Sequence, residues 1–332
     1  MYFFQEPLAA YALELFRTTD FTGAARGDWF FSLFAPGNTI FFAERPFERF
    51  SDYEELLWRL READAVKYRQ IHKGIPFYFM SWLAFDLRNY EKALFYIDAG
   101  ISEDVRKNPE GWQENPGARF LLLDQRDQAA ARTVLAVRTL LERELDRFNQ
   151  TSNLPTLQVE GSWRTFVGKL MADSSQRTIV SALYVFLLEF EDRVRELTLR
   201  EGSTGGSNQP FTVHLFTGGL LFESLLKLCY PQNDRGGRNR TLGDVLWTTE
   251  FQRDFALTTA PASSARTLEE IHDAIQGGTT TVQAAFSTAA KLRNTTGHNL
   301  VWDDIFDTPQ KYIDLFQAAI KAILFVIARK LI

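Results

Sequence analysis

The stretch from Thr178 to Arg200, TIVSALYVFLLEFEDRVRELTLR, decides the fold. Its large apolar residues recur every three or four positions, at Leu183, Phe186, Leu187, Phe190 and Val194. This spacing places them on one face of an α-helix, because the helix completes a turn in 3.6 residues. The pattern predicts a long amphipathic helix whose apolar face must be covered by other helices.

Three further long helices are expected after this one. One runs from Phe211 to Tyr230 and is stopped by Pro231, and another covers about Thr279 to Thr296. Thr308-Pro309 opens the last helix, where the missing N–H of proline leaves no helical hydrogen bond unmade. The last helix is expected to bury Ile313, Phe316, Ile320, Ile323 and Leu324. Four long helices joined by polar loops predict an all-α bundle over residues 156–332.

Residues 1–155 form the other expected domain, which is also mainly helical. Ser51 and Glu54 have the spacing of a capping box at the start of a helix. The aromatic runs on either side of Pro36-Gly37-Asn38 are compatible with a short β-hairpin and equally with two short helices. A long helix over Gln125–Phe148 is followed by a polar stretch with Pro155, which indicates a domain boundary there.

Within this first domain, residues 76–109 resemble one unit of a tetratricopeptide repeat. The resemblance lies in Asn89-Tyr90-Glu91-Lys92-Ala93, which matches the turn and second helix of such a hairpin. Small residues at Ser81, Ala84 and Gly100 would let two antiparallel helices approach closely. Only one unit of this kind is found, so a degenerate repeat array and an unrelated helical hairpin both remain open.

Composition narrows the class of protein. Hydrophobic residues make up 45% and charged residues 24%, as expected for a folded globular chain. The single cysteine, Cys229, excludes an intramolecular disulfide, and the start of the chain lacks the features of a secretory signal. We expect a cytoplasmic protein without a membrane span. A formal net charge of −5 disfavours non-specific nucleic-acid binding, so any RNA contact would need a local basic patch.

The candidate reactive residues lie where the third helix of the bundle ends, in the sequence Lys291-Leu-Arg-Asn-Thr-Thr-Gly-His298. Arg293 and His298 are separated by four residues, and Asn294 directly follows the arginine. The spacing alone is expected by chance, and Arg266 and His272 provide a second match. The polar residue after Arg293 and the position before the last helix distinguish the first pair.

With this motif the second half of the chain resembles the HEPN family of helical ribonucleases. The segment from His214 to Lys227 also resembles an earlier helix of such bundles. The resemblance implies that Arg293, Asn294 and His298 are catalytic, and that two copies of the chain form one cleft. It implies RNA cleavage by the 2′-hydroxyl, with 2′,3′-cyclic phosphate and 5′-hydroxyl products. A toxin or antiviral defence effector is the biology that the family suggests.

The residue types suit this chemistry. A histidine that titrates near neutrality can move the proton of the 2′-hydroxyl, and a permanently charged guanidinium can bind the phosphate. No pair of histidines or cysteines has metal-ligand spacing, so neither a metal nor another cofactor is expected. Glu223 and Lys227, four apart on one helix, are supporting candidates. Arg235, Arg238, Arg240 and Lys291 are the candidates for binding RNA phosphates.

Structural roles compete with each of these assignments. His298 could cap a helix end, and Arg293 could pair with Asp303 or Asp304. Among the other histidines, His214 is expected to be structural and His272 to be an exposed helix residue. The alternative function is a non-catalytic adaptor that binds a nucleotide or a protein within a defence or toxin–antitoxin complex. In either case residues 1–155 would bind a regulatory or nucleic-acid-guided partner.

Overall fold

The computed structural model describes residues 6–21, 29–30, 46–124, 131–201, 207–261, 267–276, 281–297 and 308–332. Within these ranges the chain is mainly α-helical and contains no strand, only an isolated bridge between Gln232 and Arg238. The predicted all-α class is therefore confirmed. Of the segment that was compatible with a β-hairpin, Trp29 and Phe30 are helical, and residues 31–45 lie outside the described part.

The chain divides into two compact units, residues 1–135 and 136–332. The division falls inside a helix, earlier than the boundary after residue 155 that the sequence suggested. The helices of the first unit are α1 (Glu6–Thr18), α3 (Pro46–Ala63), α4 (Ala65–Gln70), α5 (Gly74–Asp86), α6 (Tyr90–Lys107), η3 (Trp112–Glu114) and α7 (Pro116–Leu121). Helix α8 (Ala131–Thr151) begins in the first unit and continues in the second.

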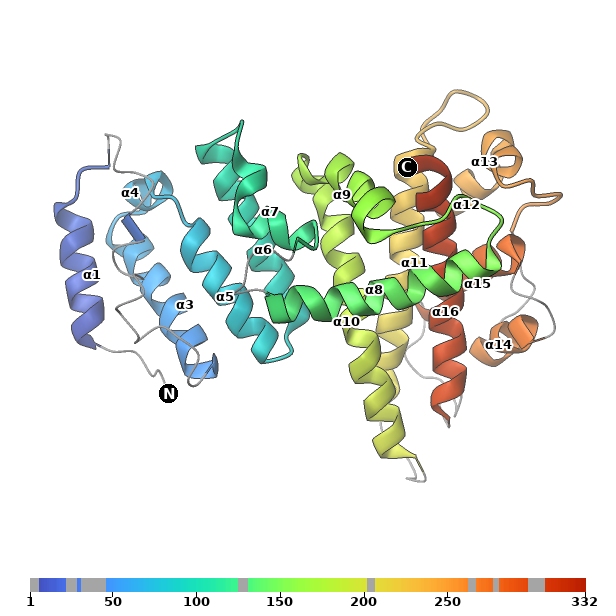
Figure 1. Ribbon diagram of the computed structural model, residues 1–332, viewed down its shortest axis with the longest axis horizontal. Coiled ribbons are helices and arrows are strands. Elements are labelled where there is room, and N and C mark those ends of the chain that lie inside the picture. Colours follow the sequence, from blue (N-terminus) through green and yellow to red (C-terminus); the bar gives the residue numbers. More distant parts are fainter. Residues whose placement is uncertain are drawn as a thin grey trace. The chain divides into compact units, whose positions relative to one another are not determined.

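The helices of the second unit are η4 (Val159–Trp163), α9 (Arg164–Met171), α10 (Ser174–Arg200), α11 (Gln209–Cys229), α12 (Leu242–Leu246), α13 (Thr249–Asp254), α14 (Leu268–Gln276), α15 (Val282–Thr296), α16 (Pro309–Val326) and η5 (Ile327–Leu331). Helices α10, α11, α15 and α16 run side by side as a bundle (Figure 1). Helix α11 touches the other three, and α16 packs against both α10 and α15. The four-helix bundle expected from the sequence is therefore present.

Aromatic rings fill the core of this bundle. Phe190 of α10 stacks on Phe316 of α16 with ring centroids 3.7 Å apart. Phe186 packs on the same ring, so the apolar face predicted for α10 is buried against α16. In α16 the prediction was wrong at Ile313, which is only half-buried, whereas Tyr312 is fully buried. Because α16 contacts helices on several sides, its buried surface is wider than one apolar stripe.

Helix α3 starts a turn earlier than the sequence suggested. It begins at Pro46, so Ser51 and Glu54 lie inside the helix and do not form a capping box. The buried face of α3 comprises Phe50, Tyr53, Leu57 and Leu60. Because this apolar stripe already includes Phe50, packing favours continuing the helix through residue 51 rather than starting it there.

Helices α5 and α6 form the hairpin expected around residue 89. The side chain of Asn89 caps α6 by accepting a hydrogen bond from the Lys92 backbone N–H (3.1 Å). Ser81, Ala84 and Gly100 are all buried. The close helix pairing is therefore confirmed, while membership of the tetratricopeptide repeats stays a prediction.

Helix α14 begins at Leu268, and the Thr267 hydroxyl accepts a hydrogen bond from the Glu270 backbone N–H (3.1 Å). The expectation that His272 is exposed was wrong. The ring is buried, with 9% of its surface exposed, and its Nε2 lies 2.9 Å from the Asp314 carboxylate of α16. The Asp314 carboxylate, 42 residues later in the sequence, is the hydrogen-bonding partner that makes burial of this histidine favourable.

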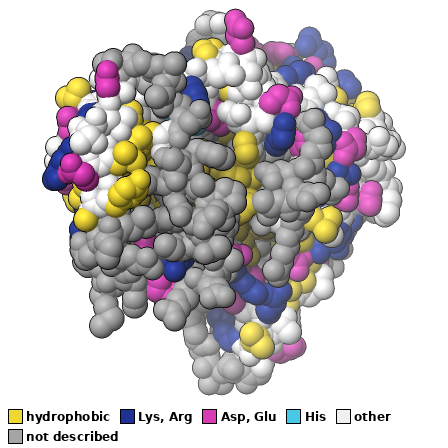
Figure 2. Space-filling view, turned by 60° about the vertical axis from the view of Figure 1, so that its left-hand side comes forward, with side chains coloured by type: hydrophobic (Ala, Val, Ile, Leu, Met, Phe, Trp, Pro, Cys, Tyr) yellow, Lys and Arg dark blue, Asp and Glu magenta, His cyan; other side chains and the backbone are white. Residues whose placement is uncertain are grey.

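Among the described residues, α11 alone is long and apolar enough to cross a membrane. Of its most apolar window, 61% is buried inside the protein, where α10, α15 and α16 surround it. Such a helix is compatible with the core of a soluble bundle. On the face shown in Figure 2, basic and acidic side chains are intermixed over the described surface. This agrees with the small net charge of the chain.

Candidate functional site

Helix α15 places Arg293 on the rim of the bundle. The Thr281 hydroxyl caps the start of this helix by accepting a hydrogen bond from the Ala284 N–H (3.1 Å). One face of the helix is buried, including Phe286, Ala289 and Leu292. Arg293 lies next to this face, and about one third of its side chain is exposed.

Gly219 of α11 allows the two helices to meet closely at Arg293. A Cβ added to this glycine would lie 2.7 Å from both the Cβ and the backbone N of Arg293. Backbone cannot move aside as the end of a flexible side chain can, so no larger residue fits there. The contact fixes the position of the Arg293 backbone relative to α11. Gly219 lies one turn before Glu223 on this helix.

The guanidinium of Arg293 is anchored on Glu223. Its Nε donates a hydrogen bond to Glu223 Oε2 (2.5 Å). Lys227 Nζ contacts the other carboxylate oxygen, Oε1, at 2.6 Å. Glu223 itself is buried, with 4% of its surface exposed, whereas both cations reach solvent. One buried carboxylate therefore holds two partly exposed cations, and the three charges sum to one net positive charge.

Opposing effects act on Glu223. Burial would raise the pKa of its carboxyl, but the hydrogen bonds from Lys227 and Arg293 outweigh burial and hold the pKa below its usual value. Glu223 therefore stays ionised at neutral pH and keeps the two cations in place. Asn294 adds to the cluster, since its Oδ1 accepts a hydrogen bond from Arg293 Nη1 (3.2 Å).

Four of the five predicted catalytic and supporting residues thus come together, namely Arg293, Asn294, Glu223 and Lys227. His298 lies outside the described residues, as do Asp303 and Asp304. The helix end just before His298 is nevertheless held against α11. A Cβ on Gly297 would lie 2.7 Å from the Phe216 ring, so glycine allows the chain to pass closely over this side chain.

Arg235, Arg238 and Arg240 lie on an ordered loop after α11, and all three are exposed. Asn233 Oδ1 accepts hydrogen bonds from the backbone N–H groups of residues 235 and 237 (both 3.0 Å). The buried Asn239 side chain donates to two backbone carbonyls of the loop. No ion pair joins these arginines to an acid among the described residues. The loop therefore presents three cations from a defined backbone.

The end of this loop is close to Lys227. Backbone hydrogen bonds from Thr241 and Arg240 lower the pKa of Asp244, and the charge of Lys227 contributes to the same direction of shift. Lys291, by contrast, is half-buried and lies two residues before Arg293, which places it on another face of α15. The structure does not bring Lys291 into the Glu223 cluster.

His214 is a structural residue, as expected from the sequence. Its Nε2 donates to the Phe186 carbonyl (2.8 Å), and its Nδ1 accepts from the Tyr312 hydroxyl (2.7 Å). Burial lowers the pKa of His214 to about 3, so the ring is neutral at physiological pH. Both nitrogens are occupied, which leaves no capacity for a substrate.

Two side-chain arrangements were not expected from the sequence, a histidine–aspartate contact and an aromatic pocket. His72, which had no partner pattern, lies 2.8 Å from Asp104 on α6, 32 residues later. Several aromatic residues of α3, α5 and α6 line a pocket. Helical spacing could not separate a core ring from a pocket ring, since both lie on the inward face. Among the described residues no group of three potential metal ligands occurs.

No protein-family model matches the chain, and the comparisons with curated proteins and with solved structures find no match either. The grounds for a functional proposal are therefore the helical fold and the cluster around Glu223.

Proposed function

We propose that the chain is a metal-independent endoribonuclease that cuts RNA through the 2′-hydroxyl of the substrate. The observation that supports this most directly is the anchoring of Arg293 on Glu223, five residues before His298. Glu223 accepts from Nε of the guanidinium, Nη1 donates to Asn294, and about one third of the Arg293 side chain is exposed. A guanidinium held in this way is oriented before it meets a phosphate, which is what electrostatic catalysis requires.

In the proposed reaction His298 removes the proton of the 2′-hydroxyl, whose oxygen then forms a bond to the adjacent phosphorus. The bond between phosphorus and the 5′ oxygen breaks, and that oxygen takes up a proton as it leaves. The products are a 2′,3′-cyclic phosphate and a 5′-hydroxyl, and no water is consumed. Arg293 would bind the phosphate oxygens as their charge grows, and Asn294 would help to hold them.

A homodimer through the second unit is part of the proposal. Val213 and Leu220 of α11 are apolar yet exposed, at 44% and 38% of their surface. They lie about three turns and about one turn, respectively, before Glu223 on the same helix. Such a pair can pack against a second copy and bring two Arg293 clusters to one cleft. The substitution Leu220→Glu should then lower the molecular mass measured in solution toward that of the monomer.

A toxin or a defence effector in the cytoplasm is the biological role we propose. RNA cutting inside a cell needs restraint, and residues 1–155 would provide it by binding a regulatory or nucleic-acid-guided partner. The helical hairpin of α5 and α6 supports this, because packed hairpins commonly serve as binding scaffolds. Arg235, Arg238 and Arg240 would bind RNA phosphates outside the reactive centre.

The test uses the full chain with single-stranded RNA in the presence of a chelator. Wild type should cut, and His298→Ala and Arg293→Ala should each lower the rate by about 10²–10⁴ without loss of helical content. Arg253→Ala is the matched control, because this arginine is exposed on α13. A substrate with a 2′-deoxy residue at the cut should resist cleavage.

Two outcomes would overturn the proposal. One is cutting at the same rate by wild type and by His298→Ala. The other is RNA binding without cutting under all activating conditions tried, which would favour the non-catalytic adaptor.

A further inference from the structure

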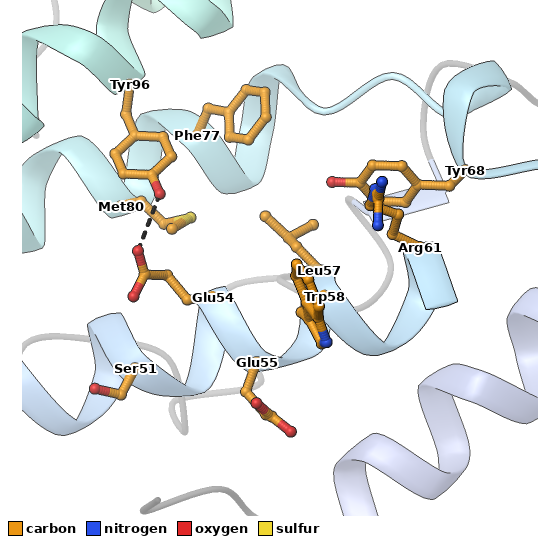
Figure 3. Close-up of a pocket in the computed structure, with 10 residues that line it drawn as sticks. All are labelled: Ser51, Glu54, Glu55, Leu57, Trp58, Arg61, Tyr68, Phe77, Met80 and Tyr96. Carbon is orange, nitrogen blue, oxygen red and sulfur yellow. Dashed lines mark hydrogen bonds between the residues drawn. The ribbon is translucent and has the colours of Figure 1, made fainter. Parts of the chain in front are cut away.

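The first unit contains a pocket of about 450 Å³ that the proposed ribonuclease activity does not use. It is lined by residues from α3, α4, α5 and α6, namely Ser51, Glu54, Glu55, Leu57, Trp58, Arg61, Tyr68, Phe77, Met80 and Tyr96 (Figure 3). A volume of this size lies in the range of small-molecule sites. Every lining residue that the structure describes belongs to one compact unit.

Aromatic rings give the pocket its shape. Trp58, Tyr68, Phe77 and Tyr96 come from four different helices, and Phe77 and Tyr96 pack with ring centroids 5.6 Å apart. Trp58 leaves 59% of its surface exposed, which is unusual for so large an apolar side chain. Leu57 and Met80 are buried apolar residues of the lining, with Leu57 between the two ends of the pocket and Met80 close to Tyr96. Flat rings around an apolar floor suit a planar aromatic ligand, which can stack on them.

One end of the pocket offers hydrogen-bond acceptors. The Tyr96 hydroxyl donates its proton to Glu54 Oε1 (3.2 Å), so its oxygen can only accept from a ligand (Figure 3). Glu54 Oε2 accepts no hydrogen bond from the residues that the structure describes. At this end Glu54 and Tyr96 therefore select a ligand that carries N–H or O–H donors.

The charges at this end are already balanced. Lys92 Nζ lies 2.9 Å from Glu54 Oε1, and Arg59 Nε donates to Glu55 Oε1 (2.8 Å). A cationic ligand would gain little here, because each carboxylate already has a cation beside it. A neutral donor, such as the amino group of a heteroaromatic ring, fits this end better.

The opposite end offers donors. Arg61 lies beside Tyr68 (Figure 3) and is half exposed. Its Nη1 binds the adjacent Glu62 (3.0 Å), and its remaining N–H groups meet no acceptor among the described residues. Burial raises the pKa of Tyr68 to about 12, so its hydroxyl keeps its proton at neutral pH. This end selects an oxygen acceptor, such as a ribose hydroxyl or a phosphate.

We propose that this pocket binds a nucleoside or nucleoside monophosphate whose base carries an amino group. The base would stack on Trp58 and Phe77, its amino group would donate to Glu54, and the ribose or phosphate would face Arg61. The first unit would then bind a small molecule, independently of whether the second unit cuts RNA.

Titration calorimetry on the full chain tests this with adenosine, adenosine monophosphate and purine riboside, whose base has no N–H. Adenosine should bind saturably, and purine riboside should bind about tenfold more weakly, since one hydrogen bond to a charged group is lost. Glu54→Ala should weaken the binding of adenosine and abolish the difference in affinity between adenosine and purine riboside. Trp58→Ala should weaken both by about tenfold, through loss of stacking.

Matched controls are Trp247→Ala, which removes a tryptophan 69% exposed on the second unit, and Glu91→Ala, which removes an exposed glutamate of α6. Both should bind adenosine like wild type. If the monophosphate binds more tightly than adenosine and Arg61→Ala removes the gain, the ligand is a nucleotide; equal affinities identify a nucleoside.

Three results would overturn the proposal. They are no saturable adenosine binding in the millimolar range, equal affinity of the wild type for adenosine and purine riboside, and unchanged binding by Trp58→Ala. None of them depends on RNA cleavage, so failure here leaves the ribonuclease proposal to its own test.

Discussion

Two polar clusters on α11 behave in opposite ways. Around His214 every hydrogen-bonding nitrogen is used inside the protein, by the Phe186 carbonyl and the Tyr312 hydroxyl. Around Glu223 only the carboxylate is buried, and its two cationic partners extend to the surface. The first cluster is closed to any ligand, whereas the second can still bind an anion through Arg293 and Lys227.

This difference shows why burial of a titratable group does not by itself indicate function. Desolvation is the main cause of the lowered pKa of His214, and its ring has no hydrogen-bonding capacity left. Glu223 has a lowered pKa because its cations outweigh burial, and those cations keep donors near solvent. Remaining hydrogen-bonding capacity, rather than the size of a pKa shift, distinguishes the candidate site.

The largest expected effect comes from replacing the anchored guanidinium. Arg293→Lys keeps the charge but loses the planar fork that can bind Glu223 and a phosphate together. We expect the single-turnover rate of RNA cleavage to fall by about 10²–10³, with an unchanged melting temperature. Arg253→Lys is the control, because Arg253 is exposed on α13, and it should stay within a few-fold of wild type. Wild-type rates for Arg293→Lys would exclude Arg293 as the phosphate-binding group.

The next effect should appear in stability and not in catalysis. His214→Phe removes the hydrogen bond that the buried Tyr312 hydroxyl donates to His214 Nδ1, which should lower the free energy of unfolding by about 2 kcal/mol. Urea denaturation measures this loss. Adding Tyr312→Phe should recover part of it, since both partners are then apolar. Reduced cleavage per folded molecule of His214→Phe would show that the two clusters are coupled.

A third effect should appear as a dependence of stability on pH. The folded pKa of His214, about 3, is below its usual 6.5, so the unfolded chain binds more protons between these values. The contribution of His214 is complete above pH 6.5 and is lost as pH falls toward 3, by about 1.4 kcal/mol per unit.

Comparison with His214→Phe isolates this contribution. Between pH 6.5 and 4.5 the difference in unfolding free energy between the two proteins should shrink as the pH falls. Below 4.5 the depressed folded pKa of Glu223 lowers the stability of both proteins, so this loss cancels in the difference. A difference that stays constant across the window would mean that His214 is not held neutral.

The smallest effects are expected on the loop after α11. Replacing Arg235, Arg238 or Arg240 by Ala should weaken RNA binding by only a few-fold each. Each loss should also reduce the salt dependence of binding by about 0.7 in the slope of log K against log salt. Fluorescence anisotropy at several salt concentrations measures both. Unchanged slopes for all three variants would show that this loop does not contact phosphates.

Local patterns were sufficient to predict the long helices. Apolar spacing located α10 and α11, and Thr308-Pro309 located the start of α16. The same patterns failed where packing extended an element, as at Pro46, a turn before the supposed cap at Ser51. They also failed at His272, which is buried because Asp314 lies across from it on another helix.

The candidate site shows the same limit. Sequence spacing brought Arg293, Asn294 and His298 together, because they are neighbours along the chain. It also paired Glu223 with Lys227, four apart on one helix. It did not predict that Glu223 binds Arg293 across 70 residues, which follows from the close approach of α11 and α15 at Gly219.

The sequence by itself determined that the chain is helical and which residues of each helix are apolar, since both follow from interactions within a few residues. Tertiary structure alone decided which polar groups meet, for their partners lie on helices distant in sequence. The two kinds of polar group differ in their remaining hydrogen-bonding capacity. At His214 every donor and acceptor is hydrogen-bonded inside the protein, so the group is part of the core. Where one buried carboxylate left its cations at the surface, the protein kept a place to bind an anion.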